Sequence, residues 1–326
     1  MVTSAAEDIG LAPEWMKWET QAGTRPVLSG DIPNMRQQMD GLSQLLKDQW
    51  NDFHPLDGGV STIDLVTPCG LDVRVYQPED SKGKAVPIGA FYHCGGYCIG
   101  GIQVEDTLVR NLCKLSQTVI ASIQYRHAPE YPAPTALDDC VRATKWVASN
   151  AASWGADPNK LYTMGPSAGA ALSISVPLRL HDEGGDSAGL VKGVISLSPC
   201  EVHPDHIPEK FKGMHTSAEN SAGRLPVIDI ESMRTFYSTY TVPLDDKYTF
   251  AIYYPKLQVL PPVYIVSAEF DPLRDDAYVF EKLVKEAGGK ITHKTYKGLP
   301  HVFWLFPLPQ SLQFFEDTAK AIKGLF

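Results

Sequence analysis

Short, continuous apolar runs recur through the middle of the chain, and they predict strands that are covered on both faces. A run that is apolar at nearly every position is typical of a buried strand in a parallel sheet, whereas a half-exposed strand alternates. Two earlier segments, 62–66 and 71–76, do alternate, and we expect them to form an exposed antiparallel pair. The continuous runs lie at residues 86–92, 118–123, 160–164, 191–197 and 263–266.

Helix-patterned segments lie between and after these runs. They cover residues 104–116, 137–150, 168–180, 275–287 and 311–322. Regular alternation of strands and helices indicates a mostly parallel sheet with helices on both faces. The predicted fold class is therefore α/β. A length of 326 residues fits one domain with an embedded cap better than two independent domains.

Two segments depart from this alternation. Residues 1–60 contain a helical stretch at 35–50 but no strand pattern before residue 62. Residues 201–256 combine prolines and charged residues with an aromatic, helix-like stretch at 230–240. Because neither segment continues the sheet, we expect them to form one cap over the carboxyl edge of the strands.

The sequence Gly-Pro-Ser-Ala-Gly at 165–169 joins the apolar run at 160–164 to the helical segment that follows it. A serine flanked by glycines between a strand and a helix is typical of a nucleophile elbow, a turn too tight for larger neighbours. The turn leaves the serine oxygen exposed at the amino end of a helix, where the helix dipole favours developing negative charge. Ser167 is therefore the predicted nucleophile.

Two later loops supply the partners that a weak serine nucleophile needs. Asp271 follows the last apolar run, and His301 follows a strand-like segment at 291–296. We expect His301 to accept the serine proton and Asp271 to orient the imidazole, in the chain order Ser, Asp, His. Two rival carboxylates lie close by: Glu269 could accept a hydrogen bond behind the site, and Asp275 could cap the next helix.

A glycine-rich stretch follows the first continuous apolar run. Residues 93–101 read His-Cys-Gly-Gly-Tyr-Cys-Ile-Gly-Gly. Glycines let backbone amides approach a substrate oxygen, which is what an oxyanion hole requires. A tight glycine turn without a binding role would give the same pattern. The presence of Ser167, Asp271 and His301 in the same chain favours the oxyanion hole.

Composition narrows the range of partners. The net charge of −9, from 29 basic and 38 acidic residues, argues against a nucleic-acid partner. The chain shows neither an amino-terminal apolar segment nor an apolar run of about 18 residues, so we expect a cytoplasmic protein without a membrane span.

The six scattered cysteines predict reduced, mostly buried thiols. No further ligands accompany Cys94 and Cys98, or His203 and His206, so neither a metal nor another cofactor is expected.

Together these segments resemble the hormone-sensitive-lipase-like group of the α/β hydrolases, which carries an H-G-G-G motif upstream of a G-D-S-A-G elbow. Residues 125–134, Tyr-Arg-His-Ala-Pro-Glu-Tyr-Pro-Ala-Pro, are similar to the group's Y-R-L-A-P-E-x-P-x-P segment. Residues 271–275 and 298–301 are similar to its D-P-L-R-D and G-x-P-H segments. The resemblance spans nearly the whole chain, and it implies an α/β-hydrolase fold over residues 1–326.

Carried over to this chain, the resemblance implies a triad and an oxyanion hole. The triad would be Ser167, Asp271 and His301, and the oxyanion donors would be the backbone amides of Gly95, Gly96 and Ala168. Three residues depart from the group's pattern. Cys94 replaces the first glycine of the triplet, Pro166 replaces an aspartate, and His127 replaces an apolar residue. None of them removes a triad residue, but we expect Cys94 and Pro166 to alter the rate or the substrate range.

The predicted function is hydrolysis of a carboxylic ester through an acyl-enzyme on Ser167. The aromatic residues Trp15, Trp18, Tyr97 and Trp304 suggest contacts with a mid-sized apolar or aromatic ester, although aromatic residues on helices often belong to the core. Residues 298–304 resemble fungal esterases of secondary metabolism, which implies a similar role here. The alternative is a lyase, dehydratase or cyclase with the same pocket. A homodimer is compatible with the sequence.

Overall fold

The computed structural model describes residues 9–55, 58–81, 85–218 and 225–326. Within these residues the strands form one eight-stranded sheet in the order β1-β2-β4-β3-β5-β6-β7-β8. The pairs β1 with β2 and β2 with β4 are antiparallel, and the remaining pairs are parallel. The strands are β1 (Val60–Val66), β2 (Asp72–Pro78), β3 (Val86–Tyr92), β4 (Val119–Ile123), β5 (Ala156–Pro166), β6 (Gly193–Leu197), β7 (Val263–Phe270) and β8 (Ile291–Pro300).

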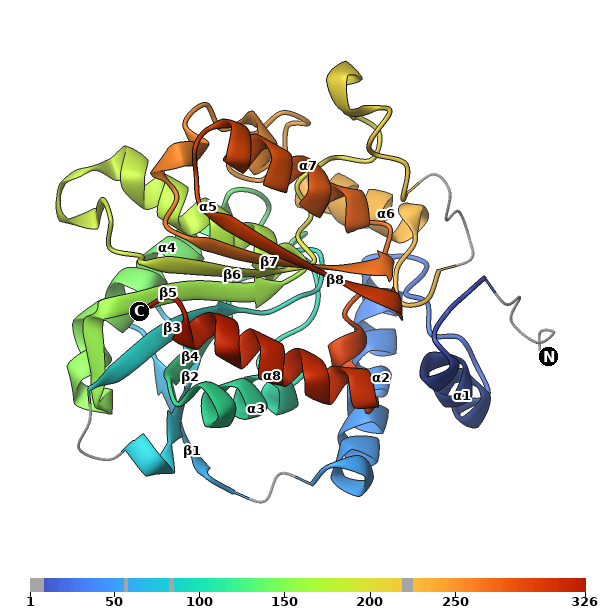
Figure 1. Cartoon of the computed structure of the whole chain (residues 1–326), viewed down its shortest axis with the longest axis horizontal. Helices are drawn as coiled ribbons and strands as arrows, with labels where there is room; N and C mark the ends of the chain where they lie inside the picture. The colour runs from blue at the N-terminus through green and yellow to red at the C-terminus, as the bar shows by residue number, and fades with distance from the viewer. Residues whose placement is uncertain (1–8, 56–57, 82–84, 219–224) are drawn as a thin grey trace.

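Helices cover both faces of this sheet, and Figure 1 shows α3 and α8 on one side with α4, α5 and α7 on the other. The predicted α/β class with a mostly parallel sheet is therefore confirmed. Every residue of β4 and β6 is buried, whereas β1 is exposed at many positions, as its alternating sequence predicts. The helices of the two faces are α3 (Asp106–Ser116), α4 (Thr135–Asn150), α5 (Ala168–Glu183), α7 (Arg274–Glu286) and α8 (Pro309–Lys323).

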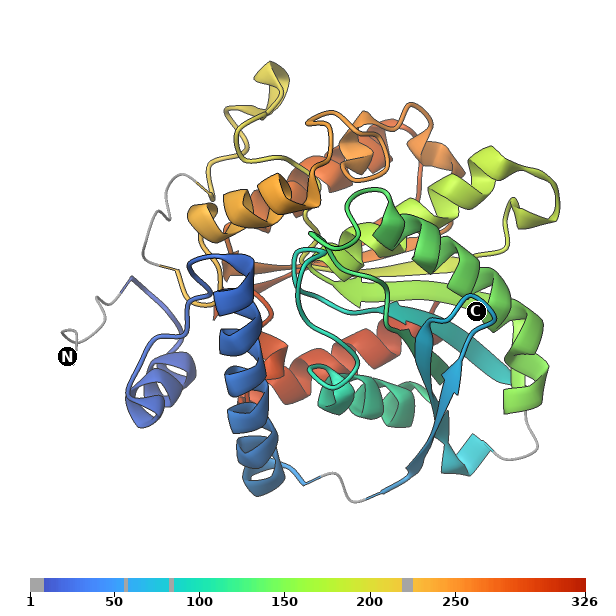
Figure 2. The same ribbon diagram turned by 180° about the vertical axis from the view of Figure 1, so that it is seen from behind.

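Three further helices lie outside these layers: α1 (Pro13–Ala22), α2 (Ile32–Phe53) and α6 (Ile230–Tyr240). Figures 1 and 2 show α2 standing beyond the carboxyl ends of the parallel strands, with α6 next to one of its ends. The amide of Leu28 donates to the carbonyl of Val227 at 2.9 Å, so the two segments that interrupt the strand and helix alternation are joined directly. We propose that they act together as the cap of a single domain.

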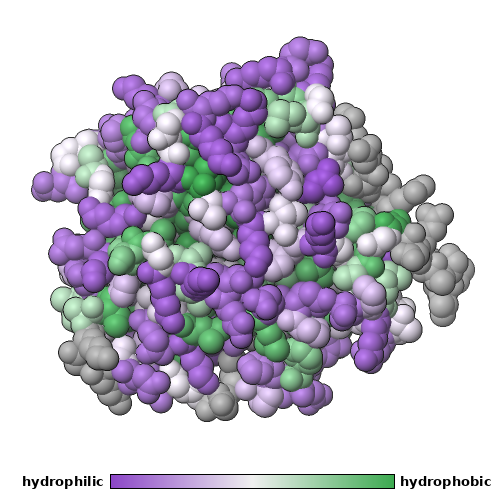
Figure 3. All heavy atoms as spheres, in the orientation of Figure 1, coloured by the Kyte–Doolittle hydropathy of each residue, from purple (hydrophilic) through white to green (hydrophobic). Residues whose placement is uncertain are grey.

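One face of the molecule is dominated by polar side chains. On the face in Figure 3, hydrophilic residues cover most of the area and hydrophobic residues form small separate patches. Scattered apolar residues are ordinary on a protein surface, whereas one large continuous patch marks an interface. Among the described residues, no helix is both long enough and apolar enough to cross a membrane.

Candidate active site

Ser167 occupies the turn between β5, which ends at Pro166, and α5, which begins at Ala168. Its backbone φ of 56° lies in the left-handed region, which a non-glycine residue adopts only under strain. A Cβ on Gly165 or Gly169 would lie 2.3 or 1.9 Å from the carbonyl oxygen of Tyr92. The elbow therefore needs both glycines because the end of β3 packs directly against it.

The imidazole of His301 and the carboxylate of Asp271 form a buried hydrogen bond, with Nδ1 2.7 Å from Oδ2. The other oxygen of Asp271 accepts the amide of Leu273 at 2.8 Å, which fixes the carboxylate. The last pair between β7 and β8 is Phe270 with Pro300. Because Asp271 and His301 each follow one member of that pair, the sheet itself sets them side by side.

The two rival carboxylates have other partners. Oε2 of Glu269 accepts the amide of Gly298 at 2.8 Å, ahead of the turn that carries His301. Asp275 accepts the amides of Thr216 and Ser217, both at 2.8 Å, and so ties the 201–256 segment to α7. The expectation that Asp275 caps α7 is wrong, because the cap position is Leu273 and Asp275 already lies inside the helix.

Gly95 and Gly96 lie on the wall of the pocket that contains Ser167 and His301. Their φ values of 116° and 57° are ones that glycine adopts without strain. A Cβ on Gly95 would lie 2.2 Å from the carbonyl oxygen of Ile99, and one on Gly96 would lie 2.3 Å from the ring of Phe236. Ala168 is the first residue of α5, where backbone amides point out of the helix end. The structure thus places the three candidate oxyanion donors around the same serine.

Side chains from several elements hold this glycine loop in place. Oε2 of Glu105 accepts the amide of Cys94 at 2.9 Å, and the carbonyl of Cys94 accepts a hydrogen bond from the ring of His93 at 2.8 Å. The hydroxyl of Tyr125 donates to the carbonyl of His93 at 2.9 Å, and Arg36 from α2 donates to the carbonyl of Cys98 at 3.0 Å. No regular spacing in the sequence links these residues, so only the folded chain identifies them.

Glu105 is fully buried, and its Oε1 has no hydrogen-bond partner among the described residues. Burial raises the pKa of its carboxyl to about 8, although the Cys94 amide acts in the opposite direction. A neutral carboxyl group therefore lies directly behind the glycine loop at neutral pH.

The residues that depart from the sequence pattern lie at or near the site. Cys94 lines the pocket, and burial raises the pKa of its thiol, which keeps the thiol protonated. Nε2 of His127 lies 3.2 Å from Nε2 of His93. Burial lowers the pKa of His93 to about 3 and that of His127 to about 4, so both rings are neutral at pH 7. Pro166 is the last residue of β5 and is paired with Leu197.

Three of the four expected substrate contacts lie elsewhere. Trp15 and Trp18 pack edge-on against Phe306 at centroid distances of 4.6 and 4.7 Å, and Trp304 stacks on Phe314 of α8 at 4.4 Å. None of these tryptophans is among the residues that line the pocket, so the structure does not bring them together with Ser167. They are large buried side chains of the core, where aromatic residues contribute most of their apolar area. Tyr97 alone lies on the pocket wall.

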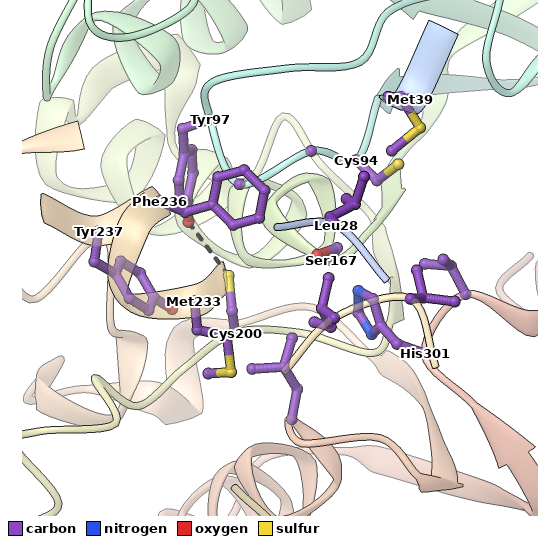
Figure 4. A pocket seen from close by; sticks show the side chains of 16 residues that line it. Leu28, Met39, Cys94, Tyr97, Ser167, Cys200, Met233, Phe236, Tyr237 and His301 are labelled. Carbon is purple, nitrogen blue, oxygen red and sulfur yellow. Dashed lines mark hydrogen bonds between the residues drawn. The ribbon is translucent and has the colours of Figure 1, made fainter. Parts of the chain in front are cut away.

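The pocket itself is small and mostly apolar, with a volume of about 40 Å³. Figure 4 shows Ser167 between two groups of side chains, with Tyr97, Phe236 and Cys200 on one side and His301 on the other. The hydroxyl of Tyr97 lies 3.6 Å from the sulfur of Cys200. The remaining lining residues are Leu28, Met39, Val227, Ile228, Met233, Tyr237, Leu273 and Val302.

Candidate ligands for a metal ion do not gather in this site. Among the described residues, no group of three or more His, Cys, Asp and Glu side chains is arranged to hold a metal ion. The arrangement that is present combines a strained serine, an imidazole bound to a carboxylate, and glycine amides in one apolar pocket. That combination can carry out acyl transfer without a cofactor.

Comparisons with known proteins agree with this geometry. Residues 90–305 match a family described as alpha/beta hydrolase fold. The chain is 36% identical over 314 residues to the versiconal hemiacetal acetate esterase of Dothistroma septosporum, covering 95% of this chain and 94% of that protein.

Solved structures show the same fold over the full length. An esterase from the hyperthermophilic archaeon Pyrobaculum calidifontis superposes with a TM-score of 0.83 at 27% identity, covering 97% of this chain and 98% of that one. Vibralactone cyclase superposes with a TM-score of 0.88 at 28% identity, covering 100% of this chain and 98% of that one. The chain therefore belongs to the α/β-hydrolase family, in its hormone-sensitive-lipase-like group, and is a carboxylesterase-type hydrolase.

Proposed function

We propose that the protein hydrolyses a carboxylic ester through an acyl-enzyme on Ser167. The observation that carries this proposal is the buried 2.7 Å hydrogen bond between His301 and Asp271 at the wall of the pocket that contains Ser167. A carboxylate on Nδ1 leaves Nε2 as the nitrogen that accepts the serine proton. The strained backbone at Ser167 supports the same role, because such strain is concentrated at functional sites.

The proposed reaction proceeds in two halves. His301 removes the proton of Ser167 as its oxygen attacks the ester carbonyl, and the amides of Gly95, Gly96 and Ala168 stabilise the oxyanion. The tetrahedral intermediate then collapses, and His301 returns the proton to the departing alcohol. Water attacks the acyl-enzyme by the same route and releases the carboxylic acid and the free serine. Asp271 stabilises the imidazolium in both halves.

The proposed physiological substrate is an acetate or another short-chain ester of secondary metabolism. A relative at 36% identity is a versiconal hemiacetal acetate esterase, and a second protein of that name from Aspergillus parasiticus is 34% identical. The volume of about 40 Å³ beside Ser167 supports a small acyl group. The structural similarity to vibralactone cyclase supports a lyase or cyclase activity, but the sequence identity to that protein is only 28%. Ester hydrolysis is therefore the better-supported proposal.

Acyl chain length provides a direct test of this proposal. With p-nitrophenyl esters, we expect acetyl to hexanoyl groups to give kcat/KM values at least about tenfold above palmitoyl. The reason is that the small apolar pocket accommodates only a few carbons without moving its walls. The measurement is the release of p-nitrophenol at equal enzyme concentration. Efficient palmitoyl turnover would show that the pocket does not limit the acyl group, and no turnover of any ester would reject the proposed function.

Glu105 predicts how activity depends on pH. At about pH 8 its carboxyl is half ionised, and a buried negative charge behind the glycine loop opposes the oxyanion. We expect kcat to fall on the alkaline side of pH 8 in the natural protein. The Glu105→Gln variant should show a smaller fall, because an amide can accept the Cys94 hydrogen bond but has no proton to lose.

The control for this prediction is the stability of the fold. The pKa of Glu105 is raised above its ordinary value of 4.5, so its contribution to stability is complete below about pH 4.5 and is lost as the pH rises through about 8. Melting temperatures should therefore fall over that window in the natural protein and fall less in Glu105→Gln. If kcat fell equally above pH 8 in the two proteins, ionisation of Glu105 would not be the cause of the fall.

A further inference from the structure

A second cavity adjoins the catalytic pocket and is much larger than it, with a volume of about 320 Å³. It lies between the loop that precedes α2, one side of α2 itself, and the residues that follow His301. The two cavities share part of their walls, so a molecule that fills one lies next to the other. The shared wall consists of Leu28, Met39, Val227 and Val302.

The second cavity lies on the His301 side of the nucleophile. Val302, Leu305 and Phe306 contribute to its wall, and they follow His301 directly in the chain. Figure 4 shows His301 on the opposite side of Ser167 from Tyr97 and Phe236. A leaving alcohol must receive its proton from the histidine, so the alcohol oxygen has to face this side. The acyl group then faces Tyr97 and Phe236.

The two volumes differ in what they can hold. One water-sized group needs about 10–15 Å³ of cavity volume. A cavity of about 40 Å³ therefore holds about three such groups, which equals the number of heavy atoms in an acetyl unit. By the same measure, about 320 Å³ holds more than twenty groups. The smaller volume surrounds Ser167, and the larger volume adjoins it at Val302, the residue after His301.

The lining of the second cavity indicates the chemistry of its occupant. Leu42, Leu46 and Phe306 are apolar residues of its lining, while Thr24 and Gln37 are exposed polar residues of the lining. Apolar side chains with a few polar groups are typical of small-molecule sites. The fitting occupant has a broad apolar body with a few polar groups.

Two of the residues that line both cavities have strained backbones. Val227 has a φ of 74° and Val302 a φ of 46°, values that are unusual for a β-branched residue. Hydrogen bonds fix the first of these valines, because its amide donates to the carbonyl of Pro26 at 2.6 Å and its carbonyl accepts the amide of Leu28 at 2.9 Å. Strained residues held in this way are concentrated around bound ligands. The backbone at the junction of the two cavities is therefore held in a defined conformation.

We propose that the second cavity is the alcohol site of the enzyme, and that it selects esters in which a short acyl group is attached to a bulky, largely apolar ring alcohol. This inference rests on the proposed ester hydrolysis, and it adds which side of Ser167 the alcohol part and the acyl part of the ester occupy. The bulky part extends past His301 along α2, and the acetyl-sized part points toward Tyr97.

Two isomeric esters test the direction in the natural protein. In 2-naphthylmethyl acetate the ring belongs to the alcohol, and in methyl 2-naphthylacetate it belongs to the acid. We expect kcat/KM to favour the first ester by at least about tenfold. Equal values, or a preference for the second ester, would overturn the inference. If neither ester nor p-nitrophenyl acetate is hydrolysed, the proposed function itself fails, so the two failures are distinguishable.

A substitution in the second cavity tests whether this cavity binds the alcohol part of the ester. Gly41 lies on the exposed side of α2, lines the second cavity only, and has no atom within 4 Å of an added Cβ. Gly41→Phe should lower the ratio of kcat/KM for 2-naphthylmethyl acetate to that for methyl acetate by at least about tenfold. Gly41→Ala should lower it far less, because a methyl group fills little of the cavity. An unchanged ratio in Gly41→Phe would overturn the inference.

The inner pocket supplies the matched control. Met233 on α6 lines the catalytic pocket but not the second cavity. Met233→Ala should raise the turnover of 2-naphthylmethyl hexanoate relative to the acetate by about fivefold, since it enlarges the acyl side. A loss of the preference for the ring alcohol in this variant would contradict the assignment of the two sides. Circular dichroism and melting curves of each variant verify the fold.

Discussion

Replacing Ser167 with alanine should lower kcat/KM for p-nitrophenyl acetate by at least about a thousandfold, because the residues of a triad act as a unit and lose nearly all their effect together. The change removes one oxygen from a residue that is 8% exposed, and it leaves the glycines of the elbow in place. The far-ultraviolet circular dichroism spectrum should therefore match that of the natural protein.

A covalent label makes the same prediction specific. A fluorophosphonate that reacts with activated serines should label Ser167 alone, and Ser167→Ala should take up no label. Ser149→Ala is a matched control, because this serine is exposed on α4 and its hydroxyl donates only to the carbonyl of Lys145. Label on another serine, or full activity in Ser167→Ala, would mean that the elbow does not carry the nucleophile.

The strands and helices could be predicted from the sequence because buried segments consist mainly of apolar residues. The runs at 118–123 and 191–197 correspond to β4 and β6, whose residues are buried throughout. The strand ends were less readable. The segment 263–266 continues to Phe270 in β7, and 291–296 continues to Pro300 in β8. The added residues include serine, glutamate, lysine and glycine, which give no apolar pattern. The strands continue because Phe270 pairs with Pro300 beyond a shift in register that follows Ala268.

The candidate site was predictable where it depends on short local turns. Ser167 is marked by its glycines, and the loops after β7 and β8 are marked by their place at the carboxyl ends of strands. The pocket wall depends instead on contacts between distant segments. Leu28 and Val227 meet only because the cap segments pair with each other, and no sequence period encodes that contact. The same limit explains Trp304: its position after His301 is clear in the sequence, but the direction of its side chain, toward α8, is set by core packing.

Replacing Asp271 with asparagine should lower kcat by roughly ten thousandfold, the effect of a triad amide that favours the wrong histidine tautomer. Asparagine keeps the shape of the side chain and its hydrogen bond from Leu273 can persist. What changes is the partner of His301 Nδ1, which loses an acceptor of full negative charge at 2.7 Å. We expect KM to change far less than kcat, because Asp271 does not line the pocket.

Asp275→Asn is the matched control, since it makes the same chemical change four positions along the chain. Burial acts to raise the pKa of Asp275, but the Arg274 guanidinium and the amides of Thr216 and Ser217 outweigh it and lower the pKa. Its charge therefore binds the 201–256 segment to α7, and its loss should lower the melting temperature while kcat falls less than about tenfold. An equal or larger fall in kcat than in Asp271→Asn would reverse the two roles. Asp275 would then have to accept the Nδ1 hydrogen bond that sets the tautomer of His301, whereas in the structure it accepts the backbone amides of Thr216 and Ser217.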